Sequence, residues 1–382
     1  MHIAIYHNIL WSKYKGGVFS QVYLQGRERD IDTSFVQIAE TDDDRTPLGG
    51  VDMSYHQYPF RLLFRGGYSK PGRFRRVMKL VRDVVAYPCD LVVMPGYHRV
   101  EYWAMLLACI VVGRRRAVFC DSTEFDRQQS RWKDIAKQLF FKRCDGFFCY
   151  GRRSKDYLLR FGVDEFRIAY RCQAAALPHS YDPKDVVEAY QSAAVNSKGV
   201  FRFLYVGRLS AEKGLHDLLE AFRQIREKRS DVRLDLVGAG PLRDELIKRV
   251  AELNLTNSVS FLGSMGMDAI AELFMPSAAL VLPSHSEPWG LVVNEALSYG
   301  CPVVVSNVCG CVPDLVIDGV TGYSFPVGNV DELAKAMLLT AEMSEDRVAL
   351  AKRCLEVIAG FTPQRAAAQI LDGCTRMIGG VR

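Results

Sequence analysis

The sequence is poor in the features that would place it in a membrane or around a metal ion. The most apolar stretch, residues 103–112, has only about ten residues, which suits a buried helix and is too short for a bilayer span. The eleven cysteines are an odd number without the paired spacing of zinc sites, which favours reduced thiols in a cytosol. The amino end lacks the apolar run of a signal peptide. We therefore expect a cytoplasmic protein without a metal site.

Length and composition indicate a globular protein of two domains. The chain has 382 residues, of which 49% are hydrophobic and 24% are charged. This length is enough for two domains that each bury a core. Short apolar runs alternate with amphipathic segments in both halves, a pattern typical of α/β folds with parallel sheets. We expect domains at residues 1–176 and 200–362, a linker at residues 177–199, and a last helix after a break near Thr362.

Positive charge is concentrated in the first half of the chain. Residues 1–200 contain 31 Lys and Arg against 22 Asp and Glu, whereas residues 201–382 contain 18 against 22. Between Arg61 and Arg82 the bases are mixed with Leu, Phe, Val and Met, a composition that suits a helix on an anionic membrane surface. The same charges could steer an acidic ligand or form a solvated helix face. Nucleic acid is not indicated, because no recognition motif accompanies them.

Two glutamates eight residues apart, Glu287 and Glu295, flank a predicted helix start. They follow the apolar run 278–282, which is typical of a buried parallel strand. Pro288 suits the first position of a helix, and Gly290 lets a ligand approach backbone N–H groups that are still unpaired. Because such a helix start binds anions, the stretch predicts a site for a phosphorylated, hydroxyl-rich ligand. The alternative is a pair of unrelated surface glutamates.

Two further strand ends lie in the same half. The strand at residues 200–206 is followed by Arg208 and Lys213, and a guanidinium with an ammonium at the carboxyl end of a parallel strand matches a diphosphate. The strand at residues 233–237 leads into the turn Gly238-Ala239-Gly240. A Gly-x-Gly turn by itself indicates helix capping as readily as ligand approach.

The first half has comparable strand ends. After the strand at residues 3–6 we expect a loop with Gly16-Gly17 ahead of a helix, where a phosphate or sugar could approach the backbone. His98, Asp121 and Glu124 follow later strands, so each could contact a ligand hydroxyl. The alternative for His98 is a capping or hydrogen-bonded structural histidine. For Asp121 and Glu124 it is a helix N-cap, because Asp-Ser-Thr-Glu is also cap chemistry.

In their order along the chain these motifs resemble those of a known family. The motifs are Gly207-Arg208-x4-Lys213-Gly214, Gly238-x-Gly240, Phe261-Leu262-Gly263, Glu287-x7-Glu295 and Pro302-Val303-Val304. Over about residues 200–330 the chain resembles the nucleotide-sugar-binding half of family 4 retaining glycosyltransferases. The resemblance implies the α/β fold called GT-B, with two doubly wound Rossmann-like domains facing across a cleft. It also implies that the C-terminal helix, about residues 363–382, crosses back to the first domain.

The resemblance further implies roles for individual residues. Arg208 and Lys213 would hold the diphosphate, Glu295 the ribose hydroxyls and Glu287 the donor sugar, while the backbone of Gly290-Leu291-Val292 approaches the phosphates. The first domain would bind the acceptor, with weaker expectations for Asp121 and Glu124. The expected catalytic residues are Glu287, Arg208, Lys213 and His98. The expected nucleotide-contacting residues are Gly16, Gly17, Arg208, Lys213, Gly238, Gly240, Gly290, Leu291, Val292 and Glu295.

The sequence departs from the family pattern at one turn. Where such enzymes usually have Gly-Gly-x-Pro-Glu, this chain has Gly310-Cys311-Val312-Pro313-Asp314. Cys311 therefore adds a side chain where none is expected, close to the predicted position of the sugar.

Three functions are compatible with this sequence. The first is transfer of a sugar from a UDP- or GDP-linked donor to a glycan or lipid-linked acceptor, without a metal or a bound cofactor. The second is an isomerase or hydrolase on the same scaffold, and the third is a non-catalytic partner protein. The intact set of Arg208, Lys213, Glu287 and Glu295 counts against the third. The basic, partly apolar surface counts against the second, which needs no docking face.

Overall fold

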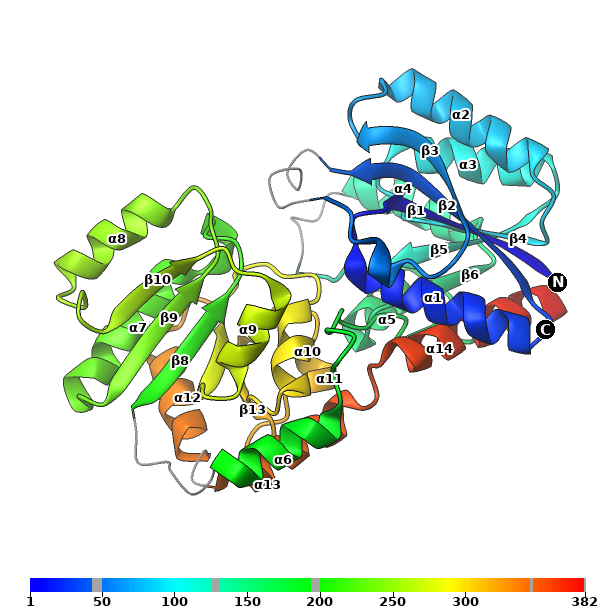
Figure 1. Cartoon of the computed structure of the whole chain (residues 1–382). Helices are drawn as coiled ribbons and strands as arrows, with labels where there is room; N and C mark the ends of the chain where they lie inside the picture. The colour runs from blue at the N-terminus through cyan, green and yellow to red at the C-terminus, as the bar shows by residue number, and fades with distance from the viewer. Residues whose placement is uncertain (43–49, 126–130, 194–199, 344–345, 381–382) are drawn as a thin grey trace. The chain divides into compact units, whose positions relative to one another are not determined.

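The computed structural model describes residues 1–42, 50–125, 131–193, 200–343 and 346–380. The chain divides into two compact units (Figure 1). The first comprises residues 1–176 and 361–382, and the second comprises residues 177–360. Among the described residues, no helix is both long and apolar enough to cross a membrane.

The first unit is built on a parallel sheet of seven strands in the order β3-β2-β1-β4-β5-β6-β7. The strands are β1 (His2–Ile9), β2 (Asp32–Thr41), β3 (Phe60–Gly67), β4 (Leu91–Met94), β5 (Arg115–Cys120), β6 (Gly146–Cys149) and β7 (Ile168–Ala169). The central strand β4 is an unbroken apolar run and is fully buried, as a strand covered on both faces must be. Consecutive carboxyl ends therefore meet at one edge of the sheet.

The described residues of the first unit form six α-helices, which cover the two faces of this sheet. They are α1 (Lys13–Glu28), α2 (Arg73–Ala86), α3 (Val100–Val111), α4 (Arg131–Lys142), α5 (Arg152–Arg160) and α14 (Pro363–Gly379). The last helix lies beside α1 (Figure 1) and is tied to it by an ion pair between Arg29 and Asp372 at 2.7 Å. Thr362 caps α14 by accepting from the backbone N–H of Arg365. The predicted return of the last helix to the first unit is thus confirmed.

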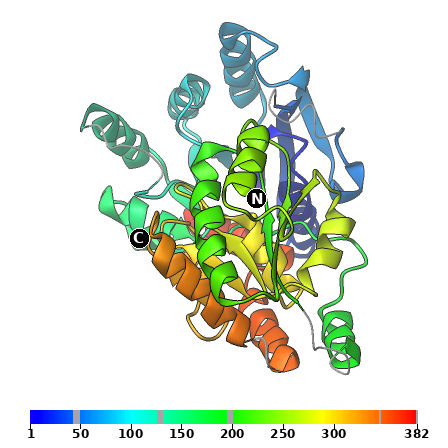
Figure 2. The same ribbon diagram turned by 90° about the vertical axis from the view of Figure 1, so that its left-hand side faces the viewer.

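The second unit repeats this construction with six parallel strands in the order β10-β9-β8-β11-β12-β13. Its strands are β8 (Phe201–Val206), β9 (Val232–Val237), β10 (Val259–Gly263), β11 (Ala279–Leu282), β12 (Val303–Ser306) and β13 (Gly322–Phe325). Its helices are α6 (Pro183–Ala193), α7 (Leu215–Lys228), α8 (Arg243–Glu252), α9 (Met267–Phe274), α10 (Leu291–Ser298), α11 (Val312–Leu315), α12 (Val330–Met343) and α13 (Arg347–Ile358). Helices α7 and α12 lie side by side on one face of the sheet (Figure 2).

The predicted linker, residues 177–199, contains helix α6, which packs on α13 within the second unit. Tyr190 of α6 is buried against Ala351 and donates a hydrogen bond to the carbonyl of Tyr299. Residues 194–199 of this segment lie outside the described part of the chain. The described part of the segment is therefore packed structure that belongs to the second unit.

One prediction about a helix was wrong, and another was confirmed only in part. Residues 60–67, expected within a basic helix, form strand β3, because Phe60, Leu62 and Phe64 supply the apolar content of a sheet edge; the helix α2 begins only at Arg73. The stretch at 103–112, expected to be a buried helix, is only partly buried. Val111 of α3 is 85% exposed because one side of α3 faces solvent while the other packs on the core.

Candidate functional site

The carboxyl edge of the second sheet brings together most of the residues that the sequence singled out. Lys213 lies in a short 3-10 turn (Ala211–Lys213) after β8, and Glu287 lies in the loop after β11. Their side chains form an ion pair at 2.5 Å, with both partners largely withdrawn from solvent. Adjacent strand ends thus place a cation and an acid in contact across 74 residues of sequence.

Arg208 belongs to the same loop as Lys213 and is exposed. Ser210 donates a hydrogen bond of 2.6 Å to Glu212 and holds the pKa of that carboxyl below its ordinary value. The charges of Lys213 and Arg208 act in the same direction, so both cations lie near Glu212. The loop is therefore a cluster of two bases and one internal acid at the end of β8.

The turn with Gly238 and Gly240 is explained by backbone packing. Gly238 has a φ of +135°, and a Cβ there would lie 1.9 Å from the carbonyl oxygen of Gly207; a Cβ on Gly240 would lie 2.3 Å from that of Leu209. The backbone of Leu209 also donates to Ala239 at 3.0 Å. These glycines let the two loops touch and so hold the Arg208 loop in place. Direct contact with a nucleotide remains a prediction.

The helix that follows Glu287 begins later than predicted. Helix α10 starts at Leu291, with Gly290 as its N-cap at a φ of +98°, so Pro288 does not occupy the first helical position. The loop is instead held from the side, because Gly310 donates to the carbonyl of Glu287 and its own Cβ position is filled by Pro288. A left-handed cap requires glycine and leaves the first N–H groups of α10, including those of Leu291 and Val292, at the carboxyl edge of the sheet.

Glu295 lies in the second turn of α10, and the pKa of its carboxyl is strongly raised. Burial raises the pKa of its carboxyl to about 8. Among the described residues no side chain or backbone group hydrogen-bonds this carboxyl. Nearby in sequence, the hydroxyl of Ser284 and the amide nitrogen of Asn294 are buried and have no hydrogen-bond partner in the described part of the chain. Glu295 is partly buried, so its carboxyl is positioned to accept hydrogen bonds from a ligand.

Cys311, the departure from the family pattern, points into the protein core. It is fully buried as the N-cap of α11, with an ordinary helical φ of −75° that any side chain tolerates. Its Sγ would lie 3.5 Å from a Cβ built on Gly290, so the thiol supports the loop that carries the α10 cap from behind. Burial raises the pKa of this thiol well above its ordinary value. The extra side chain therefore fills space under the turn.

One pair at this edge was missed by the sequence analysis. His285 Nε2 lies 2.6 Å from Asp217 Oδ2 of α7, and the backbone N–H of His285 donates to the carbonyl of Glu212. Gly214, with a φ of +65°, packs against the carbonyl oxygen of Pro283 beside them. The pair ties the Lys213 loop to the Glu287 loop. Its members are 68 residues apart, so no spacing in the sequence signals them.

The first unit carries the remaining predicted residues. Gly16 and Gly17 do not form a loop: they lie in the first turns of α1, which begins at Lys13. A Cβ on Gly16 would lie 2.9 Å from the ring of His56, so this glycine permits close packing that outweighs its poor helix propensity. Their contact with a ligand remains a prediction, and the expected loop was wrong.

His98, Asp121 and Glu124 follow strands β4 and β5 and are exposed. The His98 ring packs edge-on against Tyr97 and Tyr102. Glu124 pairs with Arg160 at 3.7 Å, and no helix begins in the described residues that directly follow it. The helix N-cap interpretation of Asp121 and Glu124 therefore has no support in the described residues, while contact with a ligand stays a prediction.

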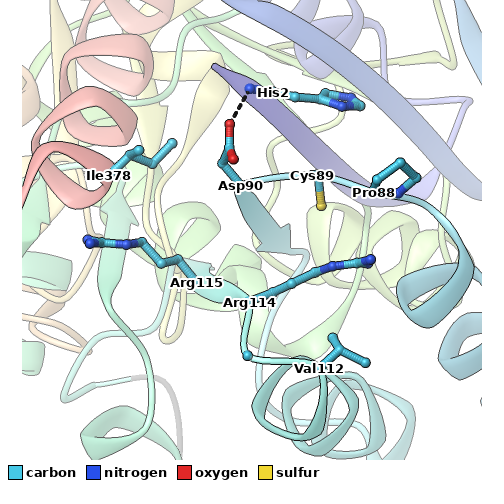
Figure 3. A pocket seen from close by; sticks show the side chains of 9 residues that line it. His2, Pro88, Cys89, Asp90, Val112, Arg114, Arg115 and Ile378 are labelled. Atoms are coloured by element: carbon cyan, nitrogen blue, oxygen red, sulfur yellow. Dashed lines mark hydrogen bonds between the residues drawn. The ribbon is translucent and has the colours of Figure 1, made fainter.

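A cavity of about 610 Å³ opens at the opposite, amino edge of the first sheet (Figure 3). Its charged groups are already used by the protein. Asp90 accepts from the backbone N–H of His2, Arg114 donates to the carbonyls of Val84 and Val85, and Arg115 donates to that of Met377. The cavity lies away from the carboxyl edge where ligands bind in such sheets. We do not assign it to the site.

Comparison with known proteins agrees with the second unit's geometry. Residues 186–355 match the family model described as glycosyl transferases group 1. The matched residues lie within the second unit. Among the described residues, no group of three or more His, Cys, Asp or Glu side chains is placed to hold a metal ion.

Individual relatives match part of the chain. A glycogen synthase of Mycobacterium tuberculosis is 37% identical over 139 residues, which is 36% of this chain and 33% of the relative. An alpha-D-kanosaminyltransferase of Streptomyces kanamyceticus is 32% identical over 176 residues, covering 46% and 45%. The chain thus spans a third to a half of the length of these relatives.

The fold similarity extends over the whole chain. Anabaena Alr3699/HepE, solved in complex with UDP, matches with a TM-score of 0.73 at 20% identity, covering 98% of this chain and 100% of that one. This confirms the predicted class of fold, GT-B, with its two α/β units and parallel sheets.

Proposed function

We propose that the protein transfers a sugar from a nucleotide-diphosphate sugar to a glycan or lipid-linked acceptor, with retention of anomeric configuration. The observation that carries this proposal is the ion pair of Lys213 with Glu287, next to Arg208 and the cap of α10. Such an edge offers a forked cation, a point cation and free N–H groups to one diphosphate. Because Anabaena Alr3699/HepE was solved with UDP and with UDP-glucose, UDP-linked donors are tested first and GDP-linked donors second.

The charges suit the bond that must break. When the bond between the anomeric carbon and the diphosphate oxygen breaks, negative charge develops on the leaving oxygen and positive character on the sugar. Arg208, Lys213 and the first N–H groups of α10 stabilise the leaving group. The acceptor hydroxyl forms the new bond to the anomeric carbon, and its proton passes to the oxygen of the leaving diphosphate. None of these steps calls for a metal ion or a bound cofactor.

Glu287 has two tasks in this scheme. Without a ligand it neutralises Lys213 at 2.5 Å, which keeps the ammonium in position. When a diphosphate binds, it competes with Glu287 for the Lys213 ammonium. The Glu287 carboxylate can then accept hydrogen bonds from sugar hydroxyls and stabilise the positive character of the sugar. His98, from the first unit, is proposed to contribute at the reacting sugar.

Glu295 supplies the recognition of the ribose. Its carboxyl has no partner among the described residues, and two ribose hydroxyls would donate to it. Those hydrogen bonds favour the ionised form and so return the pKa toward its ordinary range. The cost of burying this group is thereby offset only when the nucleotide is bound.

We further propose that the enzyme works at the cytoplasmic face of a membrane. Helix α2 has a solvent-exposed side on which apolar and basic residues alternate, with Phe74 78% exposed. The exposed members are Arg73, Phe74, Arg75, Met78, Lys79, Arg82 and Val85. Two of the bases between Arg61 and Arg82 instead form ion pairs within the first unit. Arg61 donates twice to Asp83, and the buried Arg76 pairs with Glu101 at 3.0 Å.

A thermal-shift screen tests the donor assignment. We expect uridine diphosphate to raise the melting temperature of the full chain, because a ligand that binds only the folded state stabilises it in proportion to its concentration over its Kd. UDP-sugars should do the same and should release uridine diphosphate when a lipid-linked acceptor is added. If neither uridine nor guanosine diphosphates stabilise the protein, the proposed function is wrong. Turnover without an acceptor would favour the hydrolase or isomerase alternative.

A further inference from the structure

The carboxyl edge of the first sheet contains a buried cation that the proposed mechanism does not use. Lys15, in the first turn of α1, is only 2% exposed. Its ammonium lies 4.4 Å from the ring centroid of Phe119 and 4.7 Å from that of Tyr150. Phe119 is near the end of β5, and Tyr150 directly follows β6. Among the described residues, no acceptor hydrogen-bonds this nitrogen. Two aromatic faces hold the charge, and its acceptor is missing.

The surroundings do not neutralise this group. Burial lowers the pKa of Lys15 to about 8, while Cys172 and Asp121 act in the opposite direction. Asp121 is exposed and makes no hydrogen bond to the ammonium, so it helps to keep Lys15 protonated without satisfying it. At neutral pH the site therefore holds a desolvated positive charge. Lysines are almost never fully buried unless they are paired.

Two further features of the same edge call for a ligand. Gln173, next to Cys172 in sequence, is fully buried, and neither its amide nitrogen nor its oxygen has a partner among the described residues. The first turn of α1 contains no acid, and its cap residue Ser12 makes no side-chain cap bond. The positive end of the helix dipole thus adds to the charge of Lys15.

We propose that Lys15 binds a phosphate oxygen carried by the acceptor. This rests on the proposed function and names the chemistry of the acceptor. The donor diphosphate already has Arg208, Lys213 and the α10 cap in the second unit, which leaves the Lys15 ammonium without a role toward the donor. A phosphate fits an ammonium at a helix N-terminus, and the Gln173 amide can donate to the same group.

The test uses the full chain with Lys213→Ala, which removes the main diphosphate cation of the second unit, with and without Lys15→Met. The probes are inorganic phosphate and a polyprenyl phosphate in detergent micelles, and the readout is the Kd from calorimetry. We expect Lys15→Met to weaken binding of at least one probe about tenfold or more, as loss of a charged hydrogen bond does. Weakening of polyprenyl phosphate alone indicates a lipid headgroup. Weakening of both indicates the phosphate group itself.

The outcomes that overturn the proposal are equally definite. Unchanged affinity for both probes, or no binding of either by the parent, removes Lys15 from any phosphate site. In the chain with native Lys213, loss of uridine diphosphate affinity on Lys15→Met would assign the anion to the donor instead. Normal uridine diphosphate binding together with unchanged phosphate binding would defeat this inference while leaving the proposed function intact. Lys142→Met, an exposed lysine on α4, is the control.

A stability measurement guards against misfolding of the variant. Because the native state lowers the pKa of Lys15 from about 10.5 to about 8, the protonated form is disfavoured by folding. We expect Lys15→Met to melt above the parent at pH 7, with the difference shrinking as pH rises from 8 to 10.5. A lower melting temperature would show that Lys15 is satisfied structurally, and would overturn the proposal. If Lys15→Met does not fold, Lys15→Gln replaces it.

Discussion

Among the described residues, the carboxyl edge of each unit holds an ionisable group that accepts or donates no hydrogen bond, and the two groups have opposite signs. In the second unit it is the carboxyl of Glu295, and in the first unit it is the ammonium of Lys15. Burial raises the pKa of the acid and lowers that of the base, both to about 8. The two carboxyl edges therefore suit different ligands. The edge of the second unit can accept hydrogen bonds from hydroxyl groups, and the edge of the first unit can bind an anion.

The remainder of each edge sharpens this contrast. In the second unit the cation Lys213 is already paired with Glu287, and the pair His285–Asp217 ties the same loops together. In the first unit the ammonium is flanked by aromatic rings, which attract a cation without neutralising it. A paired cation is held in a defined position before the ligand arrives. An unpaired one costs stability until the ligand is bound.

The largest effect is expected from removing the paired cation of the second unit, Lys213. Lys213→Ala should lower turnover about 10²–10³-fold, the typical loss when one group that stabilises a developing charge is removed. The fold should survive, because the Lys213 loop is held by its backbone contacts to the turn at Gly238 and Gly240. Initial rates with a UDP-sugar and far-ultraviolet circular dichroism measure the two parts of this expectation.

The matched control for that variant is Lys248→Ala, which removes an exposed lysine from α8. It should leave turnover unchanged. Near-normal turnover of Lys213→Ala would show that the paired cation serves only the loop, and the contrast between the two edges would lose its functional meaning.

Glu295→Gln should have a smaller effect that depends on pH. The carboxylate accepts two hydroxyl hydrogen bonds, so affinity for uridine diphosphate should rise with pH until the pKa near 8 is passed. The variant lacks this rise. We expect the Kd of Glu295→Gln for uridine diphosphate to exceed that of the parent about tenfold or more at pH 8.5, because hydrogen bonds to a charged group are strong. The ratio should be smaller at pH 6. The ratio also cancels the titration of the phosphate itself.

Calorimetry between pH 6 and 9 measures that ratio, with Glu272→Gln on the exposed side of α9 as the control. Equal affinities of Glu295→Gln and the parent at high pH would place Glu295 outside the ribose site. The unpaired acid would then have no ligand to explain it.

Local patterns predicted most of the strands, because buried parallel strands are uniformly apolar. The runs ending at Leu282 and Val237 became β11 and β9. The helix starts were harder. Pro288 is a good first helical residue, yet the left-handed Gly290 and the packing of Gly310 against Pro288 move the start to Leu291. Propensity is local, whereas these contacts join loops far apart in the chain.

The sequence revealed the candidate site of the second unit better than that of the first. Glu287 and Glu295 have a fixed spacing, and Lys213 stands in a recognisable loop. Lys15 was visible only as one lysine before two glycines, because its burial depends on rings supplied by β5 and β6. An unpaired charge is a property of the three-dimensional surroundings, and no spacing encodes it.

The last prediction concerns the positive charge that the first unit carries on its surface. If α2 adsorbs to anionic lipid, the double variant Lys79→Glu with Arg82→Glu should weaken binding to anionic vesicles about tenfold or more, since each base near such a surface contributes roughly 1 kcal/mol. Lys248→Glu with Lys352→Glu changes the same charge on the second unit and should have little effect. Flotation at low and high salt gives the readout, because screening weakens the adsorption. Equal binding of both double variants, or no binding by the parent, would show that α2 is a solvated helix face that does not bind lipid. Lys15 would then be the only lysine or arginine of the first unit to which the proposals here assign a ligand.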